Sequence, residues 1–232
     1  METLTGFLKK WEDDYIEATS HNPLFNLTKV SALTHGQKKF FVRAFYHARG
    51  NFYKFLWFMG SLAPSKEFKD VILANIEEEF GGSRKSHEQL YIEFAASLDV
   101  DLSEEIMFGR TNLRFIDDFN QEHISWLFHN NWDSKWSAFS AYERLDNVDY
   151  KNLYRTVSGF GLPSKSMKFF EVHRAVKHYQ RASSLLEEIW ERDANIVRSG
   201  FYFIGRHQAK MWWNLAVATF EPRIINNRGA MV

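Results

Sequence analysis

The sequence predicts an all-α fold in a single domain, on three observations. The chain has 232 residues, which suits one domain, and only 4 prolines and 12 glycines interrupt it. Apolar residues recur at helical spacing, as in Leu4, Leu8, Trp11 and Tyr15. No segment shows the alternation of apolar and polar residues that marks a half-buried strand. We therefore expect a helical bundle whose binding sites are built from side chains pointing inward from facing helices.

Turn residues divide the chain into the expected helices. The first covers 4–19 and ends before Asn22-Pro23. The second begins at Thr34, which forms a capping box with Gln37, and runs to about Gly60. Further helices are expected over 65–79, 86–98, 103–129, 134–150, 150–160, 164–192 and 194–220. Residues 1–225 form one domain in this prediction, and residues 226–232 form a flexible C-terminal tail.

Composition excludes several classes of protein. Lys plus Arg and Asp plus Glu both number 29, so the chain has no net charge to attract nucleic acid or an anionic membrane. No apolar run approaches the roughly 20 residues of a membrane span, and the N-terminus predicts an amphipathic helix rather than a signal peptide. We expect a cytoplasmic protein with no nucleic-acid or membrane partner. Cysteine is absent, which excludes disulfides, thiolate metal sites and a cysteine nucleophile.

An acidic helix end is the first candidate for chemistry. Glu77, Glu78 and Glu79 lie at the expected C-terminus of a helix, where each charge opposes the helix dipole at a cost of about 0.3–1 kcal/mol. One interpretation is that two of the three face water. The other is that at least one faces inward as a metal ligand. Gly81-Gly82 would then fold the chain back so that His87 reaches the same point.

Two further places put polar residues on apolar helix faces. Glu143 and Asp146 are three residues apart, so they share a face and repel each other unless a cation lies between them. The alternative is a surface pair neutralised by Arg144. His173 lies one turn from an aromatic pair and is either a ligand or a hydrogen-bonded core residue. Carboxylates and imidazoles from separate helices suit non-haem iron or manganese. The candidate metal ligands are Glu79, His87, Glu143, Asp146 and His173.

The order of these motifs resembles the haem-oxygenase-like diiron oxidase and oxygenase superfamily. The likeness is carried by the acidic helix end with its glycine break and His87, by Tyr142-Glu143, and by Phe169-Phe170 followed by His173. It spans about residues 35–185. The resemblance implies a seven-helix haem-oxygenase-like bundle, two Fe(II) ions as cofactor and dioxygen as co-substrate. It also implies a homodimer.

The resemblance implies the ligands residue by residue. The first glutamate of the superfamily falls on Glu78 or Glu79, and counting back from Gly82 favours Glu79. The imidazole after the glycine break matches His87, and the central glutamate matches Glu143.

The late helix departs from the pattern of the superfamily, His-x-x-x-Asp-x-x-His. His173 matches its first position, whereas Lys177 and Gln180 stand at the other two. An ammonium group repels a metal ion, so one iron is expected to be poorly held or to recruit a substitute. Asp146 is the best substitute, and His178 is the second.

Within the superfamily, the chain looks like the nitrile synthases, which convert a brominated tryptophan to an indole-3-carbonitrile. That likeness implies an amino-acid substrate in an aromatic pocket, and catalytic roles for Glu143 and Lys177. Arg43, Arg49 and Lys177 are equal candidates for pairing with the substrate carboxylate. The alternative is a metal-free protein that binds a small aromatic molecule or a protein partner. The expected pocket residues are Arg43, Phe45, Tyr46, Tyr142 and Phe169.

Overall fold

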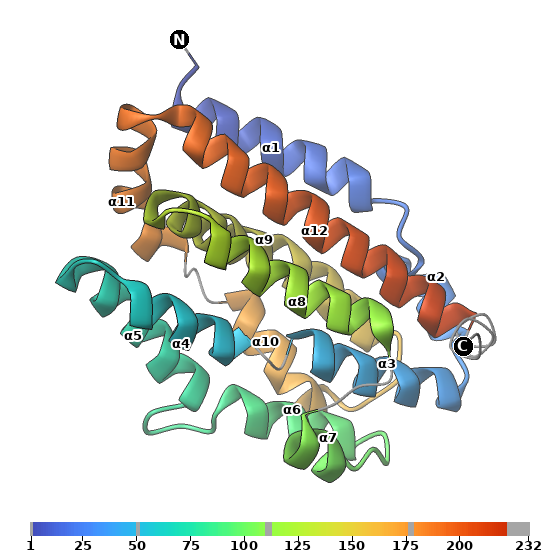
Figure 1. Cartoon of the computed structure of the whole chain (residues 1–232). Helices are drawn as coiled ribbons and strands as arrows, with labels where there is room; N and C mark the ends of the chain where they lie inside the picture. Colours follow the sequence, from blue (N-terminus) through green and yellow to red (C-terminus); the bar gives the residue numbers. More distant parts are fainter. Residues whose placement is uncertain (1, 50–51, 110–112, 176–178, 222–232) are drawn as a thin grey trace, which may run out of the picture.

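The computed structural model describes residues 2–49, 52–109, 113–175 and 179–221, and these residues contain helices and no strand (Figure 1). The all-α prediction is therefore confirmed. Lys177, His178 and the expected tail 226–232 lie outside the described residues. The α-helices are α1 (Leu4–Thr19), α2 (Leu27–Ser31), α3 (His35–Arg49), α4 (Phe52–Leu62), α5 (Lys66–Phe80), α6 (His87–Ala96), α7 (Ser103–Phe108), α8 (Arg114–His129), α9 (Trp132–Ser158), α10 (Lys168–Ala175), α11 (Tyr179–Arg192) and α12 (Ala194–Phe220), and two 3₁₀ helices, η1 (Pro23–Phe25) and η2 (Ser164–Met167), complete the set.

The prediction of seven helices is wrong, because the described residues already form twelve α-helices. The expected helix over 103–129 is interrupted at Gly109, whose φ of 58° ends α7 in a left-handed conformation. The expected helix over 164–192 begins as η2 and is divided between α10 and α11. Conversely, the two helices expected over 134–150 and 150–160 are replaced by the single helix α9, which contains no glycine or proline to break it.

α9 and α12 form the centre of the bundle. These two 27-residue helices pack most extensively against each other, with α10 against α9 and α1 against α12. Figure 1 shows the axes of α1, α12 and α8 roughly aligned, with α8 running opposite to the other two and with α6 and α7 at the opposite side of the molecule. Large rings fill the space between the layers, and Trp136, Phe139, Phe201 and Trp212 are completely buried. Much of the aromatic content is therefore bundle core.

Capping places two helices that carry site residues. The predicted capping box at the start of α3 is present, since the Thr34 amide donates to Gln37 Oε1 at 2.9 Å and the Gln37 amide to Thr34 Oγ1 at 3.3 Å. A second box, between Ser86 and Gln89, begins α6. It makes His87 the first residue of α6 and so fixes the direction in which its ring points.

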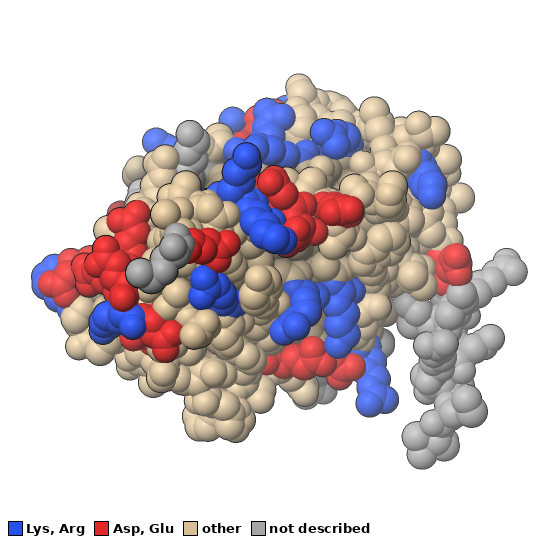
Figure 2. All heavy atoms as spheres, turned by 90° about the horizontal axis from the view of Figure 1, so that it is seen from above, with Lys and Arg blue, Asp and Glu red and all other residues tan. Residues whose placement is uncertain are grey.

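The surface mixes charges of both signs. On the face seen in Figure 2, Lys and Arg side chains are interspersed with Asp and Glu. None of the described helices has the length and apolar character needed to cross a membrane.

A close approach between α9 and α12 generates the first prediction. A Cβ added at Gly200 would lie 2.8 Å from both the Ala138 amide nitrogen and Ser137 Cβ. Gly200→Ala must therefore separate the two central helices, and we expect it to lower the free energy of unfolding by about 1–3 kcal/mol. Urea unfolding followed by circular dichroism measures the change.

Gly36→Ala is the matched control, because a Cβ there meets nothing within 4 Å. It should leave stability unchanged or raise it by up to about 1 kcal/mol. Equal unfolding midpoints for the two variants would contradict the close packing of α9 on α12.

Candidate metal centre

Glu79, His87 and His173 form the core of the candidate site. One ligand atom from each of the three lies within 4.8 Å of the other two. Glu79 Oε1 is 3.0 Å from His87 Nδ1, and the centroids of the two imidazole rings are 4.2 Å apart. Three helices supply these residues, α5, α6 and α10, and α6 packs against both of the others. The arrangement offers one carboxylate and two imidazoles to a single ion.

The turn between α5 and α6 brings Glu79 to His87. Gly81 ends α5 with a φ of 85°, and a Cβ there would lie 2.6 Å from the Arg84 carbonyl oxygen and the Ser86 nitrogen. Only glycine fits this reversal without displacing the backbone. The glycine break thus folds the chain back as the sequence predicted. Of the two candidate glutamates, Glu79 is the one whose oxygen faces His87.

Each of the two imidazole rings has one nitrogen in a hydrogen bond, which orients the ring. His173 Nδ1 lies 2.8 Å from the Phe169 carbonyl oxygen, which can only accept, so Nδ1 carries the proton and Nε2 carries the lone pair. The ring of His173 also stacks on Tyr150, with centroids 4.3 Å apart. His87 Nδ1 has the Glu79 carboxylate as its neighbour. The hydrogen-bonded core role foreseen for His173 is therefore compatible with metal binding.

Glu143 is the most deeply buried of the predicted metal ligands. It lies in the middle of α9 with 1% of its surface exposed, and neither carboxylate oxygen has a hydrogen-bond partner among the described residues. Burial, with Asp146 and Glu79 close by, raises the pKa of Glu143 well above its usual range. Arg144 does not neutralise it, because that side chain pairs with Glu12 at 2.7 Å. The surface-pair alternative is therefore wrong.

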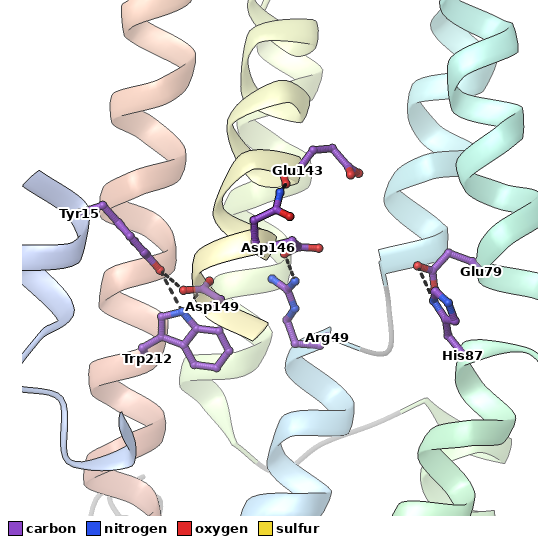
Figure 3. A network of polar contacts seen from close by, with 9 residues as sticks. Tyr15, Arg49, Glu79, His87, Glu143, Asp146, Asp149 and Trp212 are labelled. Carbon is purple, nitrogen blue, oxygen red and sulfur yellow. Dashed lines mark hydrogen bonds and ion pairs between the residues drawn. The ribbon is translucent and has the colours of Figure 1, made fainter. Parts of the chain in front are cut away.

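Asp146 has a different partner, the guanidinium of Arg49. Arg49 ends α3 and is 6% exposed, and its Nη2 contacts Asp146 Oδ1 (Figure 3). The guanidinium lies over the ring of Tyr142 at 4.5 Å and near that of Tyr150 at 5.5 Å. Burial raises the pKa of Asp146, while Arg49 opposes that rise. In this structure Asp146 forms an ion pair.

Asp149 continues the acidic stripe one turn further along α9. It is fully buried and accepts hydrogen bonds from the Tyr15 hydroxyl at 2.8 Å and from Trp212 Nε1 at 2.9 Å (Figure 3). Burial raises the pKa of Asp149 to about 7, with Arg49 opposing the rise. Asp149 is not among the residues predicted from the sequence. A signal was present, since Glu143, Asp146 and Asp149 recur at intervals of three, so each lies about one turn from the next.

A cavity of about 330 Å³ opens beside the cluster. Of the predicted metal ligands, Glu79, His87, Asp146 and His173 line it, whereas Glu143 is not part of the wall. Of the predicted pocket residues, Phe45, Tyr46 and Phe169 line it. The remaining wall includes Arg49, one of the three candidates for pairing with the substrate carboxylate, and the rings of Phe52, Tyr53, Tyr91 and Tyr150.

The structure places two other predicted pocket residues elsewhere. Arg43 forms an ion pair with Glu105 and does not line the cavity. Tyr142 stacks on Phe52, with centroids 4.8 Å apart and planes 9° apart, and lines a separate cavity of about 220 Å³. Phe52 contributes to both walls, so the two rings form the partition between the cavities. Lys177, the second predicted catalytic residue, is not among the described residues.

The sequence of the whole bundle gives an independent identification. A family model described as "iron-containing redox enzyme" matches residues 39–202, which include every ligand of the cluster and the acidic stripe of α9. The chain belongs to this family. No curated protein matches the sequence.

Solved structures share the fold of this family member. One is a domain of unknown function with a haem-oxygenase-like fold from Shewanella denitrificans, with a TM-score of 0.72, 16% identity, and coverage of 99% of this chain and 97% of the other. Another is a CADD-like protein of unknown function from Nostoc punctiforme, with a TM-score of 0.71, 15% identity, and coverage of 93% and 96%. The haem-oxygenase-like architecture is thereby confirmed.

The residues of the site fit the iron of the family. Carboxylate and imidazole ligands in a site without thiolates are those that iron accepts. The unpartnered oxygens of Glu143 provide a structural reason for a cation, because a buried carboxylate without compensation is costly. Glu79, His87 and His173 would hold one ion, with Glu143 as the neighbouring carboxylate.

The metal-free protein should lose stability as the pH rises above 6.5. The raised pKa values of Glu143 and Asp149 mean that the folded protein retains protons which the unfolded chain has released. Each such group lowers the free energy of unfolding by up to about 1.4 kcal/mol per pH unit. Below pH 6.5 the effect is opposed by His123 and His207, whose pKa values burial lowers to about 3 and 4. Thermal unfolding between pH 6.5 and 7.5, on either side of the pKa of Asp149, measures the fall.

Glu143→Gln should make this fall shallower, because the amide has no proton to lose. Asp70→Asn, at an exposed position on α5, should leave the slope of the wild-type protein unchanged. A melting temperature that is constant or rises with pH in the metal-free protein would contradict the assignment of buried protonated carboxyls.

Proposed function

We propose that this family member is a dioxygen-dependent non-haem diiron oxidoreductase whose substrate is an aromatic amino acid. The observation that carries the proposal is the Glu79–His87–His173 cluster at the wall of an aromatic cavity, with the uncompensated Glu143 beside it. Iron bound there would supply the redox chemistry and the activation of dioxygen. The protein supplies the ligands, the pocket and the exclusion of water.

The site residues divide into three roles in this proposal. Glu79, His87 and His173 bind the first ion. Glu143 and Asp146, one turn apart on α9, provide carboxylates for a second ion. Rings surround the ligands and exclude water, which strengthens every electrostatic interaction within the site.

The cavity favours a small aromatic substrate with an anionic group. Its volume of about 330 Å³ is near the lower end of the range of about 300–1,000 Å³ for small-molecule sites. Phe45, Tyr91 and Phe169 contribute rings, and edge-to-face contacts with a substrate ring contribute about 0.5–1.5 kcal/mol each. Of the two described candidates for the carboxylate, Arg49 lines the cavity and Arg43 does not. Arg49 therefore becomes the proposed carboxylate partner.

Tryptophan, or a brominated tryptophan, is the substrate that we propose. The product would be an indole-3-carbonitrile. The amine nitrogen leaves Cα and becomes bonded to the former Cβ, the bond between Cα and Cβ breaks, Cα and the carboxylate leave as an oxidised two-carbon acid, and dioxygen is the oxidant and is reduced to water. Support for this step is the aromatic wall together with the likeness to nitrile synthases in the order of motifs.

Iron binding tests the metal centre. Anaerobic addition of Fe(II) to the metal-free protein, followed by air, should give a transient visible absorption band that Glu143→Ala removes. His87→Ala should lower the bound iron about tenfold or more, because it removes one of three clustered ligands. Metal analysis after gel filtration measures the bound iron.

His35→Ala is the control for the iron experiment. His35 is an exposed imidazole whose partner is Asp99, at the far end of α3 from Arg49. It should retain the iron content of the wild-type protein. Absence of iron uptake in the wild-type protein would contradict the proposal and favour the metal-free alternative, binding of a small aromatic molecule or a protein partner.

Isotope labelling tests the substrate. L-Tryptophan and a brominated L-tryptophan, each labelled with ¹⁵N at the amine, should give the corresponding indole-3-carbonitrile with the label retained, as measured by mass spectrometry. The His87→Ala protein should form none. If the wild-type centre reacts with air while both amino acids remain intact, the nitrile reaction is wrong and the iron site stands.

Homodimerisation stays a prediction of the family resemblance. Sedimentation velocity of the full chain would measure it.

A further inference from the structure

A permanent cation lies where the second half of the proposed centre would form. Arg49 is 6% exposed, and it stays charged because a guanidinium group does not lose its proton in a protein. Its guanidinium contacts Asp146 and lies over the ring of Tyr142. Arg49 belongs to α3, whereas Asp146 and Tyr142 belong to α9, so the cation joins these two helices.

The two carboxylates of α9 are therefore unequal. Asp146 is neutralised by Arg49, whereas both oxygens of Glu143 lack a hydrogen-bond partner among the described residues. The two side chains are one helical turn apart and face the same region. Among the described residues, the guanidinium of Arg49 thus pairs with Asp146, and Glu143 is left without an opposite charge in contact.

The Glu79–His87–His173 cluster does not depend on this pair. Its three ligand atoms already lie within 4.8 Å of one another, and they come from α5, α6 and α10. An ion can bind there while Arg49 stays on Asp146. An ion bound by Glu143 and Asp146 must instead displace the guanidinium or tolerate its repulsion.

We propose that Arg49 is a built-in counter-ion that competes with the second metal ion for Asp146, so that the centre binds one ion tightly and the second weakly. The inference rests on the proposed metal centre and deepens it. Arg49 is a positioning residue in this role: it acts through Asp146, and its removal should tighten the second binding step.

Titration with Mn(II) under anaerobic conditions tests the proposal. Mn(II) accepts the same oxygen and imidazole ligands as Fe(II) and adds no redox step. Calorimetry gives the two binding constants, and the electron paramagnetic resonance signal of unbound Mn(II) gives the stoichiometry. In the wild-type protein, the second constant should be at least tenfold weaker than the first.

Variants of Arg49 and Asp146 separate competition from a general effect on folding. Arg49→Gln should tighten the second step at least tenfold and change the first less than threefold. Arg49→Lys keeps the charge, so the second step should stay weak. Asp146→Asn should abolish the second step and leave the first. Arg43→Gln is the matched control, because Arg43 also lies on α3 and forms an ion pair, but with Glu105 and away from the cavity.

The outcomes distinguish the two levels of the proposal. Two equal Mn(II) binding constants in the wild-type protein would overturn the role of Arg49 and leave the metal centre standing. So would an Arg49→Gln protein that binds the second ion as weakly as the wild-type protein or more weakly. If the Arg49→Gln protein does not fold without metal, the Asp146→Asn protein provides the test. A second Mn(II) binding constant that Asp146→Asn leaves unchanged would also overturn the role of Arg49. No bound Mn(II) or Fe(II) in the wild-type protein would overturn the metal centre, and the inference with it.

Discussion

The structure depends on the burial of three carboxylates along α9, Glu143, Asp146 and Asp149. An ionised carboxylate taken out of water costs several kcal/mol unless hydrogen bonds or an opposite charge compensate it. Each of the three is compensated differently: Asp149 accepts two hydrogen bonds, Asp146 pairs with Arg49, and Glu143 has neither. The lack of a partner for Glu143 lowers stability, and for the same reason a cation beside Glu143 is favourable. Stability and metal binding in this bundle are therefore properties of the same side chains.

The helices packed around α9 bring the other ligands to its carboxylates. α10 packs on α9 and brings His173, while α6 packs on α10 and brings His87. The reversal at Gly81 adds Glu79 without needing another long-range contact. Aromatic rings surround the ligands and keep the local dielectric low, which strengthens attraction and repulsion alike. A small number of charges can thus dominate the chemistry of the site.

Local features of the site were predictable from the sequence, and long-range ones were not. Glu79 and His87 are eight residues apart and joined by a glycine break, so their meeting follows from chain geometry. The pair of Arg49 and Asp146 spans 97 positions, and no local pattern indicates it. Tyr142 precedes Glu143 directly, and one residue rotates a helix by about 100°, so the two side chains face different regions. The family resemblance supplied the architecture, but its helix count missed breaks caused by single residues such as Gly109.

The hydrogen bonds of Asp149 have a consequence for where the functional unit ends. Tyr15 lies in α1 and Trp212 near the end of α12, and both positions fall outside residues 39–202, the segment matched by the family model. A chain trimmed to that segment would keep every proposed ligand and lose both donors to Asp149, leaving another uncompensated charge one turn from Asp146. α1 and α12 therefore act as electrostatic support for the centre, and this support extends beyond the family segment.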